Sequence, residues 1–247
     1  MRYFLDISYK GTRYHGWQIQ PNANTIQAEI EGALSKIYRL QVGIIGSGRT
    51  DTGVHAAQQI AHFDAEDSLP VDQITYKLNA ILPNDIVINQ CQIVKQDAHA
   101  RFDAVERAYV YRMRTTRSAF GENEHLFVPY DLDIDLMNQA AKVLEGKQDF
   151  ESFSKVKTEV NHFICDIRAA YWERKGEELV FHVRADRFLR GMIRALVGTL
   201  IEVGRAKLSQ DQFVDILKAK DRTKAGKAAS PDGLYLNKVD YPSEIYI

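Results

Sequence analysis

Segments with the alternation of a β-strand and segments with the spacing of an α-helix interleave along the whole chain. Within the first hundred residues, apolar and polar residues take turns as half-buried strands require over 2–9, 55–63 and 86–96. Apolar residues recur at helical spacing over 26–37, and again directly after Pro70. We expect Asn24, with Gln27 three residues later, to cap the first of these helices.

The remainder of the chain repeats this mixture. Strands are predicted over 107–116, 164–174, 178–185 and 234–241. Helices are predicted over 134–145, ended by Gly146, then from near Asp186 to Gly204, and after Ser209, which forms a capping pair with Gln212. This order predicts an α+β fold in which the helices cover one face of a largely antiparallel sheet. The stretch 97–103 is the predicted linker between the two parts.

The most unusual local feature is a glycine-rich block over 46–56, GSGRTDTGVHA, which runs directly into one of the predicted strands. Glycine permits backbone conformations and close approaches that a Cβ would prevent. Asp51 lies in this block, with Arg49 two residues before it. A carboxylate and a guanidinium on such a loop are suited to act on a ligand. The structural alternative is a turn in which Asp51 binds its own backbone.

Residues 43–50 also fit the phosphate-loop spacing G-x-x-x-x-G-K-[ST], except that Arg49 replaces the lysine. A phosphate loop must open a helix, and its lysine acts as a compact charge. Here Gly53 follows three residues after Thr50, and the residues beyond it alternate like a strand. A phosphate-loop nucleotide hydrolase is therefore the weakest of the functional interpretations.

The cysteine content and the lengths of the apolar stretches indicate the cellular compartment of the protein, but they do not indicate its binding partner. Cys91 and Cys165 form no disulfide framework in 247 residues and show no metal-ligand spacing, which is typical of a reducing compartment. The N-terminus lacks the apolar run of a signal peptide, and the apolar stretch 195–201 is too short to cross a bilayer. We therefore expect a cytoplasmic protein that contacts no membrane.

The net charge of −1 conceals two basic segments. Five arginines and two acids lie between Arg101 and Arg117, and four arginines and one acid lie between Arg184 and Arg194. Aromatic residues lie within or beside both segments. Phosphate groups require a local positive field, and bases stack on aromatic rings, so this distribution is compatible with RNA as a partner. A solvated surface is the alternative.

Further blocks accompany the glycine-rich one in a set order. They are 9–12, 14–21, 25–27, 99–104, 107–111, 149–153, 188–198, 233–236 and 239–242. Together with GRTDTGVHA at 48–56, this set closely resembles the TruA family of tRNA pseudouridine synthases over almost the whole chain. Thr52 stands where many members carry Ala, which leaves the aspartate untouched.

The resemblance implies two pseudo-symmetric α+β halves, 1–100 and 101–247, that share one sheet with the active-site cleft between them. It implies an isomerase that breaks the N1–C1′ bond of a uridine, turns the base and rejoins it through C5. This reaction has no redox step or phosphoryl transfer, so neither a cofactor nor a metal is expected. The implied substrates are tRNA uridines at positions thirty-eight to forty of the anticodon stem-loop, and the implied assembly is a homodimer.

Asp51 matches the catalytic aspartate of the family. Burial raises the pKa of a carboxyl by about 3 to 5 pH units, whereas a contacting Arg lowers it by about 1 to 3, so a buried ionised aspartate needs a cationic partner. Arg194 matches the arginine of the family's Met-x-Arg block and is the expected partner. In a helix that begins near Asp186, Arg187 and Arg190 share a face with Arg194.

Two further residues match the family's substrate contacts. Arg49 resembles the residue that helps to extrude the target uridine, and Tyr109 resembles the tyrosine that stacks on the flipped base. Extrusion costs a few kcal/mol, and stacking returns about 1–3 kcal/mol per base. The structural alternatives are an arginine that braces the loop and a strand tyrosine in the core. For the whole chain, the alternative is a non-catalytic tRNA-binding module of the same fold. Trp17 is expected to be a packing residue, and the histidines are expected to be structural or to face the RNA.

Overall fold

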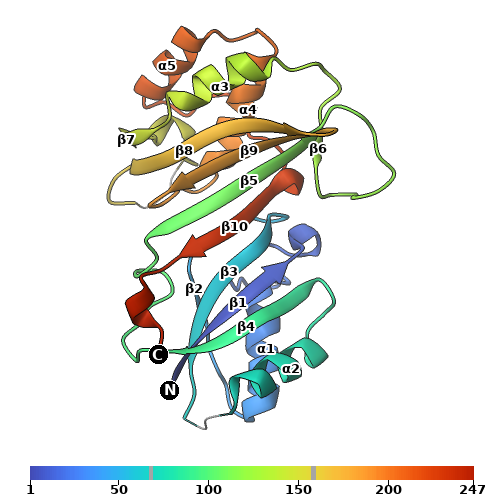
Figure 1. Cartoon of the computed structure of the whole chain (residues 1–247), viewed down its shortest axis with the longest axis vertical. Coiled ribbons are helices and arrows are strands. Elements are labelled where there is room, and N and C mark those ends of the chain that lie inside the picture. The colour runs from blue at the N-terminus through green and yellow to red at the C-terminus, as the bar shows by residue number, and fades with distance from the viewer. Residues whose placement is uncertain (67–68, 157–159) are drawn as a thin grey trace. The chain divides into compact units, whose positions relative to one another are not determined.

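The chain, described here by a computed structural model over residues 1–66, 69–156 and 160–247, separates into two units. Met1–Glu106 and Tyr235–Ile247 form the first, and Arg107–Leu234 form the second. Each unit combines strands with helices, and the pairing of the described strands is largely antiparallel (Figure 1). The predicted α+β class is therefore confirmed. The cleft expected between the two halves stays a prediction.

In the first unit the strands follow the order β4–β1–β3–β10. Their bounds are Arg2–Tyr9 for β1, His55–Asp64 for β3, Ile86–Val94 for β4 and Leu234–Asp240 for β10. β1 is antiparallel to both of its neighbours, whereas β10 runs parallel to β3. A short strand that the sequence did not predict, β2 at Ile45–Gly46, pairs with β3. Within this unit, the last strand of the chain thus lies beside strands that come from the first hundred residues.

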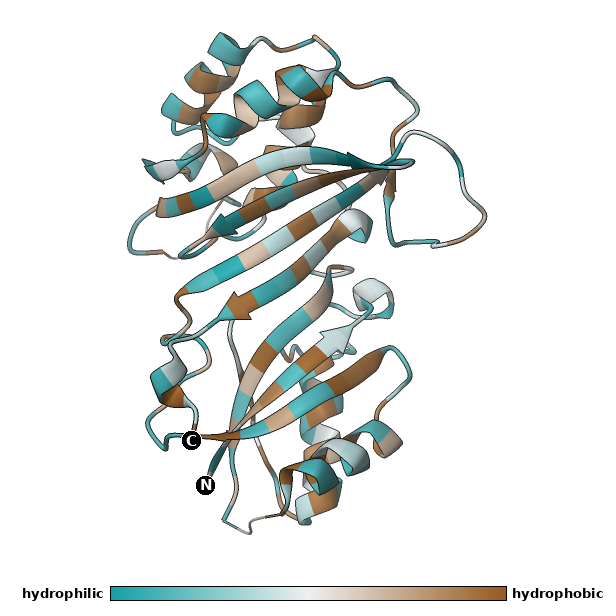
Figure 2. Cartoon of the chain, viewed as in Figure 1, coloured by the Kyte–Doolittle hydropathy of each residue, from teal (hydrophilic) through white to brown (hydrophobic). Residues whose placement is uncertain are grey.

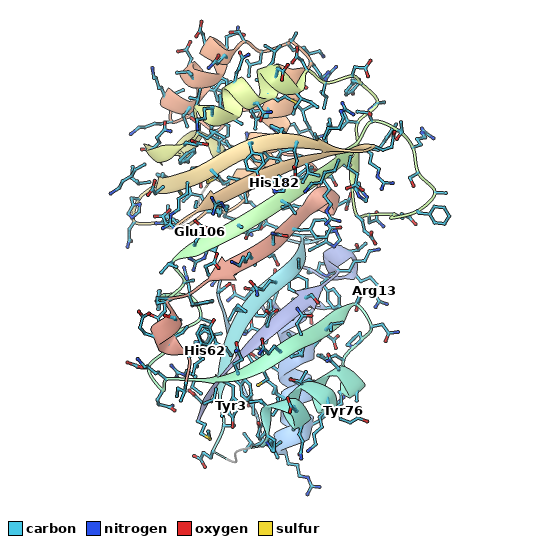
Figure 3. The ribbon with its side chains drawn as sticks, viewed as in Figure 1. Tyr3, Arg13, His62, Tyr76, Glu106 and His182 are labelled. Atoms are coloured by element: carbon cyan, nitrogen blue, oxygen red, sulfur yellow. The ribbon has the colours of Figure 1, made fainter. Side chains whose placement is uncertain are left out.

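Helices α1, Ile26–Tyr38, and α2, Val71–Ile81, belong to the same unit. Figure 2 shows apolar and polar residues interspersed along β1 and β3. Tyr3, labelled in Figure 3, and Leu5 of β1 are fully buried, as are Ile30 and Leu34 of α1. The core of this unit forms because one face of the sheet and one stripe of each helix are apolar.

The cap of α1 differs from the prediction. Thr25, and not Asn24, is the residue before the helix, and its hydroxyl accepts a hydrogen bond from the amide of Ala28 at 3.4 Å. The side chain of Gln27 donates instead to Glu31 Oε1 and to the carbonyl of Ile44. The sequence therefore contains a capping residue followed by Gln27, but the Gln27 side chain binds Glu31 and Ile44 instead of forming part of the cap.

In the second unit the strand order is β5–β9–β8–β7. The bounds are Glu106–Arg114 for β5, Gly146–Asp149 for β7, Ile164–Lys175 for β8 and Glu178–Ala185 for β9, and a short β6 at Leu126–Phe127 runs parallel to β5. Three helices, α3 Ile134–Lys142, α4 Met192–Gly204 and α5 Gln210–Lys218, lie on one side of this sheet (Figure 1). The capping box of Ser209 and Gln212 is confirmed. Within the described residues, no helix has both the length and the apolar character needed to cross a membrane.

Two predicted helix boundaries in this unit are wrong. Helix α3 ends at Lys142, and Gly146, which has φ +93°, begins strand β7 instead of ending a helix. Helix α4 begins at Met192 rather than near Asp186, after Gly191 with φ +71°. The carboxylate of Asp186 accepts hydrogen bonds from the amides of Asp166 on β8 and of Arg187. These bonds tie the start of the segment between β9 and α4 to the sheet.

Candidate active site

Asp51 lies in a loop, residues 47–54, that enters strand β3. The side chain of Asp51 is half-buried, and Arg49 is exposed. The backbone carbonyl of Asp51 accepts a hydrogen bond from the amide of Val54 at 3.1 Å. Gly53 has φ +79°, a value that residues with a Cβ rarely adopt, so the turn requires a glycine there. The carboxylate thus sits on a tight turn and outside the core.

The Asp51 loop is held by a second segment of the same unit, residues 11–17, which we call the brace. The amide of Gly53 donates to the carbonyl of Tyr14 at 3.2 Å, and the amide of Trp17 donates to the carbonyl of Thr50 at 3.1 Å. A Cβ on Gly11 would lie 2.0 Å from the carbonyl oxygen of Val54. The two backbones therefore touch, and Asp51 is positioned by the main chain on both sides of it.

Buried side chains complete this support. The hydroxyls of Tyr9 and Thr50 are 2.8 Å apart in a hydrogen bond, and Gln59 Nε2 donates to the carbonyl of Gly48 at 3.0 Å. His55 Nδ1 accepts from the amide of Gly11 at 3.1 Å. The sequence does not single out Tyr9 or Gln59, although Tyr9 lies in the block 9–12, because nothing in a local pattern shows which loop a distant tyrosine will reach.

Trp17 is a packing residue, as predicted. It is 3% exposed, and its ring lies so close to Gly46 that a Cβ there would be 2.6 Å from it. His55 is also structural, since it is 1% exposed and its ring stacks on Tyr235 with centroids 4.6 Å apart. Among the described residues, no group of His, Cys, Asp or Glu is arranged to hold a metal ion.

Tyr109 lies on β5 in the second unit and is half-buried. Its ring meets that of Phe188 edge to face, with centroids 5.2 Å apart and an interplanar angle of 84°. Tyr111, on the same face of the strand, is fully buried, and its hydroxyl donates to the carbonyl of Ser230 at 2.7 Å. Burial raises the pKa of Tyr111, so this hydroxyl remains protonated. Tyr111 is therefore a core tyrosine, whereas Tyr109 keeps an accessible surface.

Arg194 lies in the first turn of α4 and is half-buried. Its Nε donates to the carbonyl of Ala229 at 2.7 Å, and the amide of Ala229 donates to the carbonyl of Arg194 at 2.9 Å. The first bond holds the guanidinium at its Nε, and the second joins the backbones of the two residues. Because α4 begins at Met192, the predicted sharing of one helical face by Arg187, Arg190 and Arg194 is wrong.

Residues 226–230, which we call the strap, lie against α4 at its small residues. A Cβ on Gly198 would be 1.9 Å from the carbonyl oxygen of Lys227. Thr199 is 1% exposed, and its hydroxyl donates to the carbonyl of Ala195 at 2.8 Å while accepting from the amide of Gly226 at 3.0 Å. Gly198 and Thr199 of α4 therefore contact a segment of their own unit, and that segment positions Arg194.

Removing the hydroxyl of Thr199 is expected to loosen the strap. Thr199→Val keeps the volume but leaves the amide of Gly226, which is only partly buried, without its acceptor, and this costs up to about 1–3 kcal/mol of unfolding free energy. Thr199→Ser keeps the hydroxyl and is the matched control. Urea denaturation should show a lower midpoint for the valine variant with an unchanged slope. Equal midpoints for both variants would contradict a role for this hydrogen bond.

Some arginines of the two basic segments bind groups within the protein itself. Arg107 Nη1 donates to the carbonyl of Asp186 at 2.9 Å, and Arg114 forms an ion pair with Glu178 at 2.7 Å. Arg184 and Arg190 are exposed. The binding of RNA by these segments stays a prediction, but it cannot be assigned to all of their arginines equally.

The family model described as tRNA pseudouridine synthase matches residues 7–103 and 140–242. The chain belongs to the tRNA pseudouridine synthase family. Among curated proteins, it is 48% identical to tRNA pseudouridine synthase A of Bacteroides thetaiotaomicron, with 99% of this chain and 92% of that one aligned. It is 42% identical to tRNA pseudouridine synthase A of Exiguobacterium sibiricum, with 98% and 97% aligned. This tRNA pseudouridine synthase is accordingly an isomerase that modifies tRNA.

A structural likeness also exists with a chain of the crystal structure of a Cbf5-Nop10-Gar1 complex. It covers 95% of this chain and 58% of that one, with 14% identity and a TM-score of 0.37. A TM-score this low establishes no relationship, so the membership in the pseudouridine synthase family is based on sequence.

The family assignment agrees with the local structure at residues 43–50. A phosphate loop opens a helix whose amides bind the phosphates. In this pseudouridine synthase the residues after Thr50 form a turn and then strand β3, His55–Asp64. The geometry that a nucleotide hydrolase requires is therefore not present at this block.

Proposed function

We propose that this enzyme converts uridine to pseudouridine at positions thirty-eight to forty of the tRNA anticodon stem-loop, with the carboxylate of Asp51 as its catalytic group. The observation that carries the proposal is the construction of the Asp51 loop. Main-chain bonds from Tyr14 and Trp17 hold the turn, while the Asp51 side chain remains half-buried on it. Such preorganisation is what a group that acts on a bound substrate requires.

The reaction balances without a further reactant. The N1–C1′ bond of uridine breaks, a C5–C1′ bond forms, C5 loses its proton, and N1 gains one. A carboxylate can serve as the nucleophile that forms a covalent intermediate or as a base that removes a proton. Asp51 is proposed for this role in either form.

The other assigned residues are proposed as substrate contacts. Tyr109 offers the accessible part of a ring whose edge-to-face contact with Phe188 limits its rotation, and this suits the stacking of a detached base. Arg49 is exposed beside Asp51 and is proposed to occupy the place of the extruded uridine. Arg194, whose Nε is held by the strap, is proposed to supply a directed positive charge for substrate binding.

We also infer that the enzyme is a cytoplasmic homodimer. Both cysteines are buried and unpaired, which suits a reducing compartment. Sedimentation equilibrium would measure the mass in solution, and a monomer at micromolar concentration would contradict the dimer.

The experiment that tests the proposal follows tritium released from C5-labelled, unmodified tRNA. Release is expected without added metal or nucleotide. It should persist in tRNAs that carry a uridine at only one of the three positions, and it should disappear when all three are replaced by cytidine. Tight tRNA binding without any release would favour the non-catalytic module. Release that survives the triple replacement would contradict the assignment to the anticodon stem-loop.

A further inference from the structure

The turn at residues 98–103 has no part in the proposed chemistry, yet it presents an aromatic ring to solvent. Phe102 is 74% exposed, and the guanidinium carbon of Arg101 lies 5.7 Å from the centre of its ring. We propose that Arg101 and Phe102 form a stacking platform for an unpaired nucleobase of the tRNA, other than the target uridine. The proposal rests on tRNA being the substrate, and not on the roles proposed for Asp51, Tyr109 or Arg194.

The turn is rigidly built. The amide of His99 donates to Asp103 Oδ2 at 2.7 Å, and the amide of Asp103 donates back to the carbonyl of His99 at 3.1 Å. Arg2 Nη1 donates to the carbonyl of Ala98 at 2.8 Å. The hydroxyl of Tyr241 donates to the carbonyl of Ala100. Contacts from both ends of the chain therefore hold the turn that carries Phe102.

Two histidines fix the tip. His62 of β3, labelled in Figure 3, accepts a hydrogen bond at Nδ1 from the amide of Ala100 at 3.1 Å. Burial lowers the pKa of His62 to about 4, so its ring is uncharged at neutral pH, and the hydrogen bond from the Ala100 amide requires the tautomer in which Nδ1 carries no proton. His99 Nδ1 accepts from the amides of both Arg101 and Phe102, at 3.1 and 3.3 Å. One imidazole thus sets the backbone of both platform residues.

Ring contacts continue this support to the surface. The rings of His62 and His99 meet edge to face with centroids 4.7 Å apart, and those of His99 and Phe102 are 4.3 Å apart. The His99 ring therefore supports the Phe102 ring from the protein side, while most of the Phe102 surface faces solvent. A preorganised aromatic ring loses little conformational entropy when it binds, which raises the affinity of any contact it makes.

A nucleobase fits this surface better than a protein does. Base–aromatic stacking is worth about 1–3 kcal/mol and accepts every base, and a guanidinium beside the ring can add a cation–π or phosphate contact. A protein interface, in contrast, buries about 800 Å² on each partner around an apolar centre. Lys95, Gln96 and Asp97, which precede the turn, are exposed and polar, so polar groups border the turn on this side.

The platform lies at a distance from the Asp51 loop. That loop enters β3 at His55, and the turn is attached at His62, seven residues further along the strand. At about 3.4 Å per residue, these positions are about 24 Å apart. A base on Phe102 is therefore a different nucleotide from the one that reacts, and the platform should affect tRNA binding and leave the chemical step almost unchanged.

The test compares Phe102→Ala, Phe102→Leu and Phe102→Trp. The Kd for unmodified tRNA would be measured by filter binding, and KM and kcat by tritium release. We expect alanine and leucine to raise Kd and KM about 5- to 20-fold, with kcat within about two-fold of wild type. Tryptophan should retain wild-type values, because it keeps a stacking face whereas leucine keeps only apolar bulk.

Several results would overturn the platform. Unchanged Kd for the alanine and leucine variants would do so, as would leucine behaving like tryptophan. A weaker Kd accompanied by a change of mass in sedimentation would assign Phe102 to a contact between copies of the chain. Urea denaturation of all three variants controls for folding, and the leucine variant decides the matter if alanine unfolds. If wild type released no tritium, the proposed function would fail, but the Kd series would still test the platform.

Discussion

Replacing Asp51 with Asn is expected to abolish pseudouridine formation while leaving tRNA binding within a few-fold of wild type. The amide has the shape of the carboxylate, so the turn closed by the Asp51 carbonyl and the Val54 amide should persist. It can neither attack carbon nor accept a proton. Loss of a nucleophile or its base lowers turnover by about 10⁴-fold or more in enzymes that depend on one. Tritium release and filter binding, measured on the same preparation, check both parts.

The matched control is the neighbouring residue. Thr52 is exposed, and Thr52→Ala removes a side chain from the same turn without touching the carboxylate. Its turnover should equal that of wild type. If the Asp51→Asn variant retained more than about one hundredth of wild-type turnover, the loss would be smaller than the about 10²–10⁴-fold that a general acid or base contributes, and the assignment of Asp51 as an essential group would be wrong.

Gly11→Ala should have the second largest effect, because it separates the brace from the Asp51 loop. The new Cβ would lie 2.0 Å from the carbonyl oxygen of Val54 and 2.6 Å from its carbonyl carbon. Both are backbone atoms, so one main chain must move. Overpacking of this kind costs about 1–3 kcal/mol of unfolding free energy. A displacement of about 1 Å in a catalytic group lowers turnover about 100-fold.

Gly48→Ala provides the comparison within the same loop, since no atom lies within 4 Å of the Cβ it would add. We expect its unfolding free energy to stay within about 0.5 kcal/mol of wild type. Urea denaturation gives the stabilities, and tritium release well below the unfolding transition gives turnover of the folded enzyme. Equal turnover for the two alanine variants would show that the brace does not position Asp51.

Elements that depend on neighbouring residues can be predicted from the sequence, whereas contacts between distant segments cannot. Strands β1, β3 and β9 and helix α2 follow the predicted periodicity to within a residue or so, because their pattern lies within one segment. The capping box at Ser209 is equally local. The short strands β2, β6 and β7 were missed, because two to four residues contain too little pattern to detect.

The candidate site also contains residues that the sequence identified and residues that only the structure revealed. The motif at 48–56 pointed to Asp51 and Arg49 through its resemblance to a family, and the family itself is confirmed. The supporting residues Tyr9, Gln59 and Thr199 could not be chosen from the sequence. Each acts by reaching a backbone or hydroxyl group that is distant in the chain, and many other polar residues have the same chemistry.

By itself, then, the amino-acid order determined the α+β class, most strand and helix bounds, and membership in a family that modifies tRNA. Only the tertiary structure decided where α4 begins, because the carboxylate of Asp186 binds the amide of Asp166 on another strand. It also decided that residues 11–17 hold the Asp51 loop and that residues 226–230 direct Arg194. Periodicity and capping depend on neighbours within a few residues, whereas these contacts arise from the packing of distant segments, and that is the physical reason for the division.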